Sequence, residues 1–293
     1  MRPGDADFLT LGPEDAARLT AVFRDAAGLA LGEDARFSME RKLRERVIAT
    51  GTESFAGYAA LLRAASPEGR RELDEALDLV TTHETYFFRE DYQLTAFRRE
   101  IVPSLAAQTA ATRRLTAWSA GCATGEEAYS IAALLCDAPA LAGWDARVIG
   151  TDLSRRGIAA ARRGIYGRGS FRTSPLLSAS SVVEPHDDGS RVREHLQRMC
   201  RFSQLNLLDE GRAATLGRVE AVFCRNVLIY LVPEARKAVL GVLFDRLVPG
   251  GYLMLGHSES LLGDPGPFEP VQLSDALVYR RPMTDSDPKK RAR

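Results

Sequence analysis

Polar residues interrupt apolar runs at several points of the chain, and their types and spacing are those of a ligand site. In WSAGCATGEEAYSIAALL (118–135), a β-like run leads into a helical run through a loop that contains Gly121 and Gly125. Glycines in such a loop let the main chain approach a ligand, although the loop matches neither the GxGxxG dinucleotide pattern nor a P-loop. Glu126 and Glu127 open the helix, where carboxylates either interact with the helix dipole or meet a cationic group of a ligand.

An acidic residue ends the next predicted strand. In VIGTDLS (148–154), Asp152 follows an apolar run. A carboxylate at this point can accept hydrogen bonds from both hydroxyls of a ribose. The same residue could instead cap the helix predicted over 154–163, and the residue types leave both interpretations open.

An arginine and an asparagine follow a third predicted strand. In VFCRNVLIYL (222–231), the strand is expected to end near Cys224 and to leave Arg225 and Asn226 at the carboxyl edge of the sheet. A buried arginine requires a partner, so Arg225 serves either a ligand or a structural salt bridge. A fourth segment, TTHETYFFRE (81–90), gathers threonines, aromatic residues and an arginine, which alone would fit helix capping and core packing.

The elements that must position these residues fall into two regions. Up to about residue 80, apolar residues recur at helical spacing between signals such as Gly28 and Ser54, which predicts a small α-helical bundle. After about residue 112, β-like runs alternate with helical runs, as in a parallel sheet covered on both faces, and 271–281 predicts a last, antiparallel strand. Residues 167–203 break this alternation and predict a small appended substructure, and the polar tail 284–293 is expected to be disordered.

Composition narrows the class of protein further. The chain has 293 residues, of which 45% are hydrophobic and 27% charged, as in a globular protein. Lys plus Arg and Asp plus Glu each number 39, so the basic excess of a dedicated nucleic-acid binder is missing. The 4 cysteines form no CxxC pair, which disfavours zinc and disulfide frameworks and favours a reducing compartment. With no signal core and no long apolar run, we expect a cytoplasmic protein without membrane insertion, and a monomer.

Taken together, these segments resemble one family closely, the CheR-type chemotaxis receptor methyltransferases, which are protein-glutamate O-methyltransferases that use S-adenosylmethionine. The resemblance spans roughly residues 8–281. The matching stretches, in the family's order, are TTHETYFFRE, WSAGCATGEEAYSIA, VIGTDLS followed by ARRGIY, FSQLNLLD, VFCRNVLIYL and GGYLMLGHSESL.

The resemblance implies an α/β fold with a Rossmann-like class I S-adenosylmethionine-dependent methyltransferase sheet. It places an N-terminal α-helical, receptor-docking domain over residues 1–80 and the methyltransferase domain over 81–283. A small β-subdomain that grips the receptor would be inserted at about 167–203.

The resemblance also implies the site residues. Asp152 would hold the ribose, Asn206 and Leu207 would frame the adenine, and Arg89 and Tyr230 would place the acceptor carboxylate with support from Arg225. The family usually has Asn where this chain has His83. The full set expected to bind the cofactor is His83, Thr85, Arg89, Gly121, Glu126, Asp152, Asn206, Leu207, Arg225 and Asn226.

The implied reaction is methylation of glutamate carboxylates on the cytoplasmic domain of a chemotaxis receptor, within its helical methylation region, with S-adenosylhomocysteine as product and no metal. A glutamate, with a pKa of about 4.3, is already ionised at pH 7 and needs no general base. This fits the sequence, which shows no Ser/His/Asp or Cys/His catalytic arrangement. The basic face of the second predicted helix is either a solvated surface or the receptor-docking face. Two alternatives are the same chemistry on another signalling protein and a non-catalytic module that senses S-adenosylmethionine or its product. A nicotinamide oxidoreductase would need the missing GxGxxG pattern.

Overall fold

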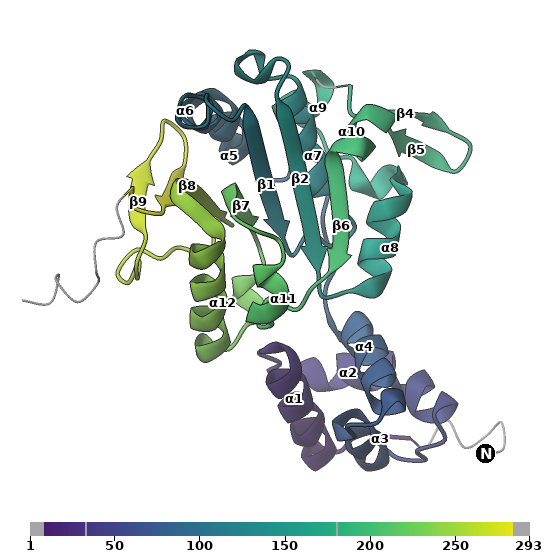
Figure 1. Cartoon of the computed structure of the whole chain (residues 1–293). Coiled ribbons are helices and arrows are strands. Elements are labelled where there is room, and N and C mark those ends of the chain that lie inside the picture. Colours follow the sequence, from purple (N-terminus) through teal and green to yellow (C-terminus); the bar gives the residue numbers. More distant parts are fainter. Residues whose placement is uncertain (1–8, 33, 180, 284–293) are drawn as a thin grey trace, which may run out of the picture.

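In the computed structural model, which describes residues 9–32, 34–179 and 181–283, the chain begins with a bundle of helices (Figure 1). The side chains of Ser54 and Ser66 accept hydrogen bonds from main-chain N–H groups in the first turns of two of them, each at 3.0 Å. The predicted helical bundle is confirmed. The predicted tail 284–293 and the first eight residues lie outside the described residues. The four helices are α1 (Pro13–Ala27), α2 (Ala35–Ala49), α3 (Phe55–Arg63) and α4 (Pro67–Val80).

A charged group lies inside this bundle and joins three of its helices. Glu72 of α4 accepts hydrogen bonds from Arg46 Nε of α2 at 2.8 Å and from the Tyr58 hydroxyl of α3 at 2.7 Å. Burial alone would raise the pKa of Glu72, but the hydrogen bonds from Arg46 and Tyr58 together outweigh burial and lower it. The carboxylate is therefore ionised in the folded protein at neutral pH.

The end of α1 joins the bundle to the rest of the protein. Gly28 ends α1 with a φ of 68°, and a Cβ at this position would lie 2.3 Å from the Cβ of Ala235. The main chain then pairs with a distant segment, since the Ala30 N–H donates to the Tyr230 carbonyl at 2.8 Å and the Val232 N–H donates to the Gly28 carbonyl at 2.9 Å. The bundle is thus tied to the sheet region by main-chain hydrogen bonds.

The second region contains a sheet of seven strands within the described residues, in the order β6-β2-β1-β7-β8-β10-β9. The first five strands of this order are parallel, and β10 and β9 are antiparallel to their neighbours. The predicted Rossmann-like α/β fold is confirmed. The strands are β1 (Arg114–Ala120), β2 (Asp145–Asp152), β6 (Cys200–Gln204), β7 (Val219–Cys224), β8 (Leu247–Leu255), β9 (Glu269–Gln272) and β10 (Leu277–Arg280).

The strand order creates a switch point beside β1. The chain passes from β1 through β2 to β6 on one side and then crosses to β7 and β8 on the other. In register, Ala120 lies beside Thr151 and Ser119 beside Phe223, so β1, β2 and β7 end at the same edge. Figure 1 shows the arrowheads of β1, β2 and β6 pointing toward the helical bundle. Ligands of such sheets bind in the crevice outside the carboxyl ends at the switch point.

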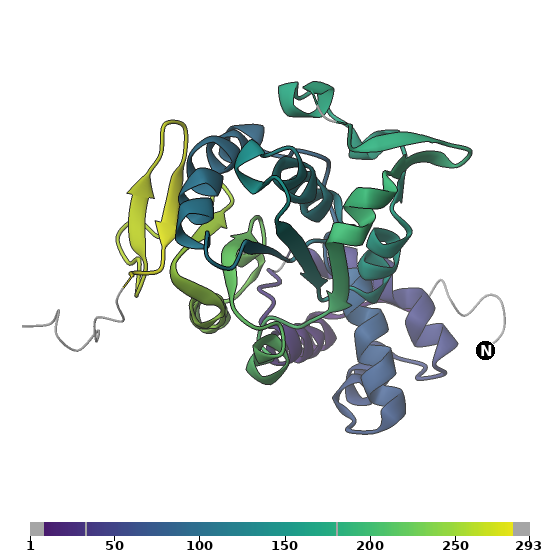
Figure 2. The ribbon, with the colours of Figure 1, turned by 45° about the horizontal axis from the view of Figure 1, so that its top comes forward.

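Helices cover both faces of the sheet, as Figure 2 shows from a second direction. On one face lie α5 (Asp91–Ala96), α6 (Val102–Gln108), α7 (Glu126–Cys136) and α10 (Glu194–Met199), with a π-helical turn over Phe97–Ile101 between α5 and α6. On the other face lie α11 (Glu210–Ala214) and α12 (Pro233–Arg246). A further helix of this region, α8 (Arg155–Arg163), contacts β2 and β6.

The appended substructure expected at 167–203 has different borders. Its small antiparallel sheet has the order β3-β5-β4 and begins before the predicted segment; its elements are β3 (Ile165–Tyr166), α9 (Pro175–Ala179), β4 (Val183–His186) and β5 (Gly189–Val192). Residues 200–204 are instead the edge strand β6 of the large sheet. This strand is short and exposed on one side, so its pattern resembles that of a surface hairpin. The single strand predicted over 271–281 is a hairpin of β9 and β10, closed by the Leu273 N–H to the Ala276 carbonyl at 2.8 Å.

Within the described ranges, the structure contains no helix that is both long and apolar enough to cross a membrane.

We expect Glu72→Gln to lower the free energy of unfolding at pH 7 by about 2 kcal/mol, because the amide cannot form the ion pair with Arg46. Urea unfolding measures this change. A lowered pKa stabilises the folded state above the ordinary carboxyl pKa, and this stabilisation is lost as the pH falls through the folded value. The difference between the variant and the wild type should therefore shrink below about pH 4. Glu68→Gln, an exposed carboxylate on the same helix, is the control. A difference that stays constant down to pH 3 would contradict this role.

Candidate functional site

A cavity of about 410 Å³ lies at the switch point of the sheet, between the strand ends and the helical bundle. The bundle supplies one wall through the end of α1 and through α2, including Leu29 and Lys42. The sheet supplies the other wall through the segments that follow β1, β2, β6 and β7. The cavity is therefore complete only when both regions are in place.

All the predicted site residues except one line this cavity. They come from the junction between the two regions, from the loop after β1 and from the ends of β2, β6 and β7. The residues brought together are His83, Thr85, Arg89, Gly121, Asp152, Asn206, Leu207, Arg225, Asn226 and Tyr230.

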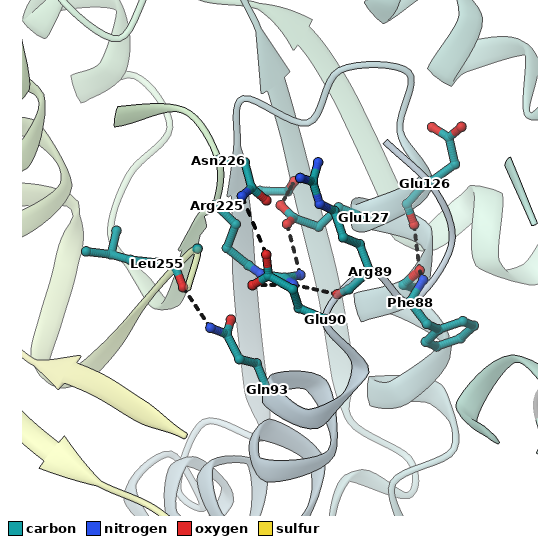
Figure 3. Close-up of polar contacts among 12 residues, drawn as sticks. Phe88, Arg89, Glu90, Gln93, Glu126, Glu127, Arg225, Asn226 and Leu255 are labelled. Carbon is teal, nitrogen blue, oxygen red and sulfur yellow. Dashed lines mark hydrogen bonds and ion pairs between the residues drawn. The ribbon is translucent and has the colours of Figure 1, made fainter. Parts of the chain in front are cut away.

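The exception is Glu126, whose neighbour Glu127 lines the cavity instead. Glu126 accepts hydrogen bonds from Thr124 Oγ1 at 2.6 Å and Ser170 Oγ at 2.7 Å, and its burial raises the pKa. Figure 3 shows its carboxylate pointing away from Arg225. Consecutive helical residues point about 100° apart, so only one of the two glutamates can face the cavity. In the structure Glu127, and not the expected Glu126, is therefore the glutamate that can contact a ligand in the cavity.

Gly121 is required by packing within the protein. Its φ is 83°, and a Cβ at this position would lie 2.4 Å from Cγ2 of Val227 in the turn after β7. The glycine thus lets the loop after β1 contact the turn after β7, which keeps the two sides of the switch point together. Gly121 also lines the cavity, so its close approach to a ligand stays a prediction.

Asp152 ends β2 with both carboxylate oxygens held by the main chain. Oδ1 accepts from the Ser154 N–H and Oδ2 from the Ala123 N–H, each at 2.8 Å. Burial raises the pKa of Asp152, and these two hydrogen bonds oppose that rise. Helix α8 is capped by Ser154, whose Oγ accepts from the Gly157 N–H, so the alternative that Asp152 caps this helix is wrong. Each oxygen keeps a lone pair for a ligand hydroxyl.

Arg225 lies between two carboxylates at the base of the cavity (Figure 3). Its guanidinium nitrogens are 3.3 Å from Glu90 Oε2 and 3.3 Å from Glu127 Oε2, and it also donates to the Arg89 carbonyl. The Arg225 side chain is only 1% exposed, so burial strengthens these contacts. Arg225 therefore forms the structural salt bridge that was one of its two expected roles, and it also lines the cavity, so a contact with a ligand stays a prediction. Two carboxylates and one guanidinium leave this cluster with one net negative charge when all are ionised.

The two carboxylates of this cluster respond differently to burial. Burial alone would raise the pKa of Glu90, but Arg225, His257 and Asn226 together outweigh it and lower the pKa. Burial raises the pKa of Glu127, and the attraction of Arg225 only partly offsets that rise. Glu127 also accepts a hydrogen bond from Ser119 Oγ at 2.6 Å.

The turn that carries Arg89 is held in an uncommon conformation. Phe88 has a φ of 57° and Glu90 a φ of 52°, which is the left-handed region that bulky residues avoid at a cost of roughly 1–2 kcal/mol each. The Phe88 N–H donates to Ser130 Oγ at 2.9 Å, and the Arg225 guanidinium holds the next carbonyl. These contacts fix the main chain of Arg89. Its side chain donates to the Glu84 carbonyl at 3.0 Å.

Asn206 and Tyr230 connect the cavity to the end of α1. Asn206 Nδ2 donates to the Ala26 carbonyl at 2.7 Å, and its Oδ1 accepts from the Leu208 N–H at 3.0 Å. The amide of Asn206 is thus engaged within the protein. The Tyr230 side chain is 44% exposed at the mouth of the cavity, where a second protein can reach it.

Sequence reasoning missed several residues of the site. Glu90, which ends the TTHETYFFRE segment, and Lys42 of α2 were assigned no role in the site from the sequence. Burial and the neighbouring Arg41 lower the pKa of Lys42. His83, which does line the cavity, lies 3.2 Å from Thr81 Oγ1 through its Nε2. Across the described ranges, no group of three His, Cys, Asp or Glu residues is arranged to hold a metal ion.

Comparison with known families and proteins agrees with this geometry. Residues 83–277 match the family model described as CheR methyltransferase, SAM binding domain, and residues 14–81 match CheR methyltransferase, all-alpha domain. The chain is 31% identical over 271 residues to Chemotaxis protein methyltransferase 2 of Vibrio cholerae, covering 92% of this chain and 93% of that protein. It is also 31% identical to Chemotaxis protein methyltransferase of Vibrio parahaemolyticus, covering 93% and 98%. It is 34% identical to Probable biofilm formation methyltransferase WspC of Pseudomonas putida, covering 92% of this chain and 62% of that protein.

We expect Arg225→Gln to lower the free energy of unfolding by about 3 kcal/mol, because it leaves Glu90 and Glu127 buried beside each other without a cation. Adding Glu127→Gln should recover part of this loss, since it removes the unpaired charge. Thermal and urea unfolding of the single and double variants measure both effects. Arg147→Gln, which breaks an exposed pair with Asp145, is the control and should change little. A double variant less stable than the single one would contradict this account.

Proposed function

The chain belongs to the CheR methyltransferase family, and on that premise we propose that it methylates glutamate side-chain carboxylates on the cytoplasmic domain of a chemotaxis receptor. The protein is an S-adenosylmethionine-dependent methyltransferase. The proposed products are glutamate methyl esters and S-adenosylhomocysteine. The observation that carries the proposal is the cavity at the switch point, which gathers residues from the segments that match the family.

The donor set of the cavity fits S-adenosylmethionine. Asp152 has free lone pairs for the ribose hydroxyls, and the leucines at 205, 207 and 29 offer an apolar surface for a flat base. The net negative charge of Glu90, Glu127 and Arg225 suits a positively charged ligand. When bound, S-adenosylmethionine supplies a methyl group activated by a positively charged sulfur.

The residues of this chain place the acceptor and exclude water from it. An acceptor glutamate is ionised at pH 7 and needs no base. Arg89 and Tyr230 line the cavity and can orient the carboxylate while leaving one lone pair free for reaction. Arg225 was expected to support the site. Because both terminal nitrogens of its guanidinium contact Glu90, Glu127 and the Arg89 carbonyl, its proposed role is to position Arg89 and the two carboxylates.

Receptor docking is proposed along helix α2, which forms part of the cavity wall. The basic face predicted there consists of Arg41, Lys42, Arg44 and Arg46, and fewer of these side chains face outward than the sequence suggests. Arg46 is paired with Glu72, Arg44 lies 2.6 Å from Glu40, and Lys42 lines the cavity, which leaves the exposed Arg41 as the outward cation of this group. Helix α2 and Tyr230 both line the cavity, which makes Tyr230 the proposed meeting point with a receptor bound there. The small sheet β3-β5-β4 is a second proposed contact for the receptor.

The main experiment is methyl transfer from tritiated S-adenosylmethionine to purified receptor cytoplasmic domains. Base-labile label on glutamate, lost when the acceptor glutamates of the receptor are changed to alanine, supports the proposal. Base-stable label would contradict it. The match to a probable biofilm formation methyltransferase favours including receptors of biofilm formation pathways as a second set of acceptors. Cofactor binding without transfer to either set would favour a sensing module instead.

We expect Asp152→Ala to weaken the binding of S-adenosylmethionine by at least about tenfold, because the ribose hydroxyls lose a charged acceptor. Isothermal titration calorimetry measures the Kd. Asp145→Ala, which changes the carboxylate at the opposite end of the same strand, is the matched control and should leave the Kd unchanged. Undiminished affinity in Asp152→Ala would reject the ribose assignment.

We expect Tyr230→Phe to lower kcat by about tenfold while changing the Kd of S-adenosylmethionine by less than about twofold, since the hydroxyl acts on the acceptor. Single-turnover methylation separates this effect from product release. Tyr252→Phe, a tyrosine of β8 outside the cavity lining, is the control. Turnover that stays at the wild-type rate would exclude this role for Tyr230.

A further inference from the structure

Glu259, in the loop after β8, is fully buried and bonds only to main-chain N–H groups among the described contacts. Its Oε2 accepts from Asn226 at 2.6 Å and from Gly256 at 2.8 Å. Its Oε1 accepts from Val227 at 2.8 Å and from Ile229 at 3.2 Å. A carboxylate offers about four acceptor positions, and all of them are filled by the backbone. Four charge-assisted hydrogen bonds offset the cost of burying the charge.

Three of the four donors belong to one short turn, which begins directly after Arg225 and leads to Tyr230. This turn follows β7, and among the described contacts its N–H groups at 226, 227 and 229 are bonded by the Glu259 carboxylate and not by a strand. Asn226 has a φ of 59°, in the left-handed region that asparagine adopts readily, but the N–H groups of the turn still need contacts from outside it. Glu259 provides those contacts from a segment 30 to 33 positions later in the chain.

Glu259 does not line the cavity, so it acts through the turn rather than on a ligand. The turn has a second support on its other side, where the Tyr230 carbonyl accepts from the Ala30 N–H. Tyr230 is therefore held between Glu259 and the end of α1. A side chain that is 44% exposed gains a fixed position only from such main-chain support.

We propose that Glu259 is a positioning residue for methyl transfer, which sets the Tyr230 hydroxyl and Asn226 at the mouth of the cavity by holding the main chain of the 226–229 turn. This inference rests on the proposed function, because it assigns a kinetic consequence to the geometry of the turn. The proposal gives the GHSES segment (256–260) an indirect role in methyl transfer, although its carboxylate, Glu259, does not line the cavity.

The test is Glu259→Gln, which keeps the shape but replaces one accepting oxygen with an amide group that cannot accept. We expect kcat to fall by about tenfold or more, with a smaller change in the Kd of S-adenosylmethionine. In the Tyr230→Phe background, the same substitution should lower kcat by less than about threefold, because the group it positions is already missing. Glu220→Gln is the matched control, since Glu220 also accepts a main-chain N–H, from Thr116 at 2.7 Å, at the opposite end of the sheet. Full turnover in Glu259→Gln, or equal losses in both backgrounds, would overturn the proposal.

A second measurement does not depend on the methylation assay. Hydrogen exchange followed by mass spectrometry should show faster exchange in peptides covering 226–229 of Glu259→Gln, while α12 exchanges as in the wild type. If Glu259→Gln does not fold, Glu259→Asp, which withdraws the carboxylate by one methylene, should show the same local change. Unchanged hydrogen exchange in the 226–229 turn would contradict the proposal that Glu259 holds its main chain. A wild-type protein that methylates no receptor would instead refute the proposed function, with the exchange result still judging Glu259.

Discussion

The site depends on one buried contact, the guanidinium of Arg225 between Glu90 and Glu127. It joins three segments that are far apart in the chain: the turn before α5, the start of α7 and the end of β7. A guanidinium can bind two carboxylates and a carbonyl at once because its donors form a planar fork, and a lysine has no such geometry. The contact fixes the left-handed turn that presents Arg89 and leaves the cavity with a negative base. Burial of the three charges makes the cluster costly to break at any one point.

The cavity belongs equally to the helical bundle and to the sheet. Main-chain hydrogen bonds at the end of α1 support Tyr230, and the side chain of Asn206 reaches the Ala26 carbonyl. A receptor bound on α2 would therefore contact the same helical bundle that supports the main chain of Tyr230. Recognition of the protein substrate and positioning of the acceptor are then properties of one rigid arrangement, which a catalytic region without its bundle would lack.

Much of this arrangement was predictable from the sequence because the signals were local. Apolar runs that end in polar residues placed Asp152, Arg225 and Asn226 at the sheet edge, and the strand ends of β2 and β7 agree with those predictions. The resemblance to the family added the residues of the junction. The features that the sequence did not predict are those that depend on tertiary contacts. The direction of Glu126 against Glu127 depends on the rotation of α7, and the edge strand β6 is too short to differ from a hairpin in pattern. The role of Glu259 depends on a turn that lies elsewhere in the sequence and reaches it only in the folded chain.

The joint between α1 and α12 restricts which residues evolution can place there. At Gly28 any side chain meets two obstacles, a left-handed φ of 68° and the Cβ of Ala235 at 2.3 Å. Relieving the second by shortening Ala235 would not remove the first, so compensating change at 235 cannot free position 28. Homologues that keep this joint should therefore retain glycine at 28 and vary at 235 only among the smallest residues, and a larger pair at these positions marks a relative whose bundle is seated differently on the sheet.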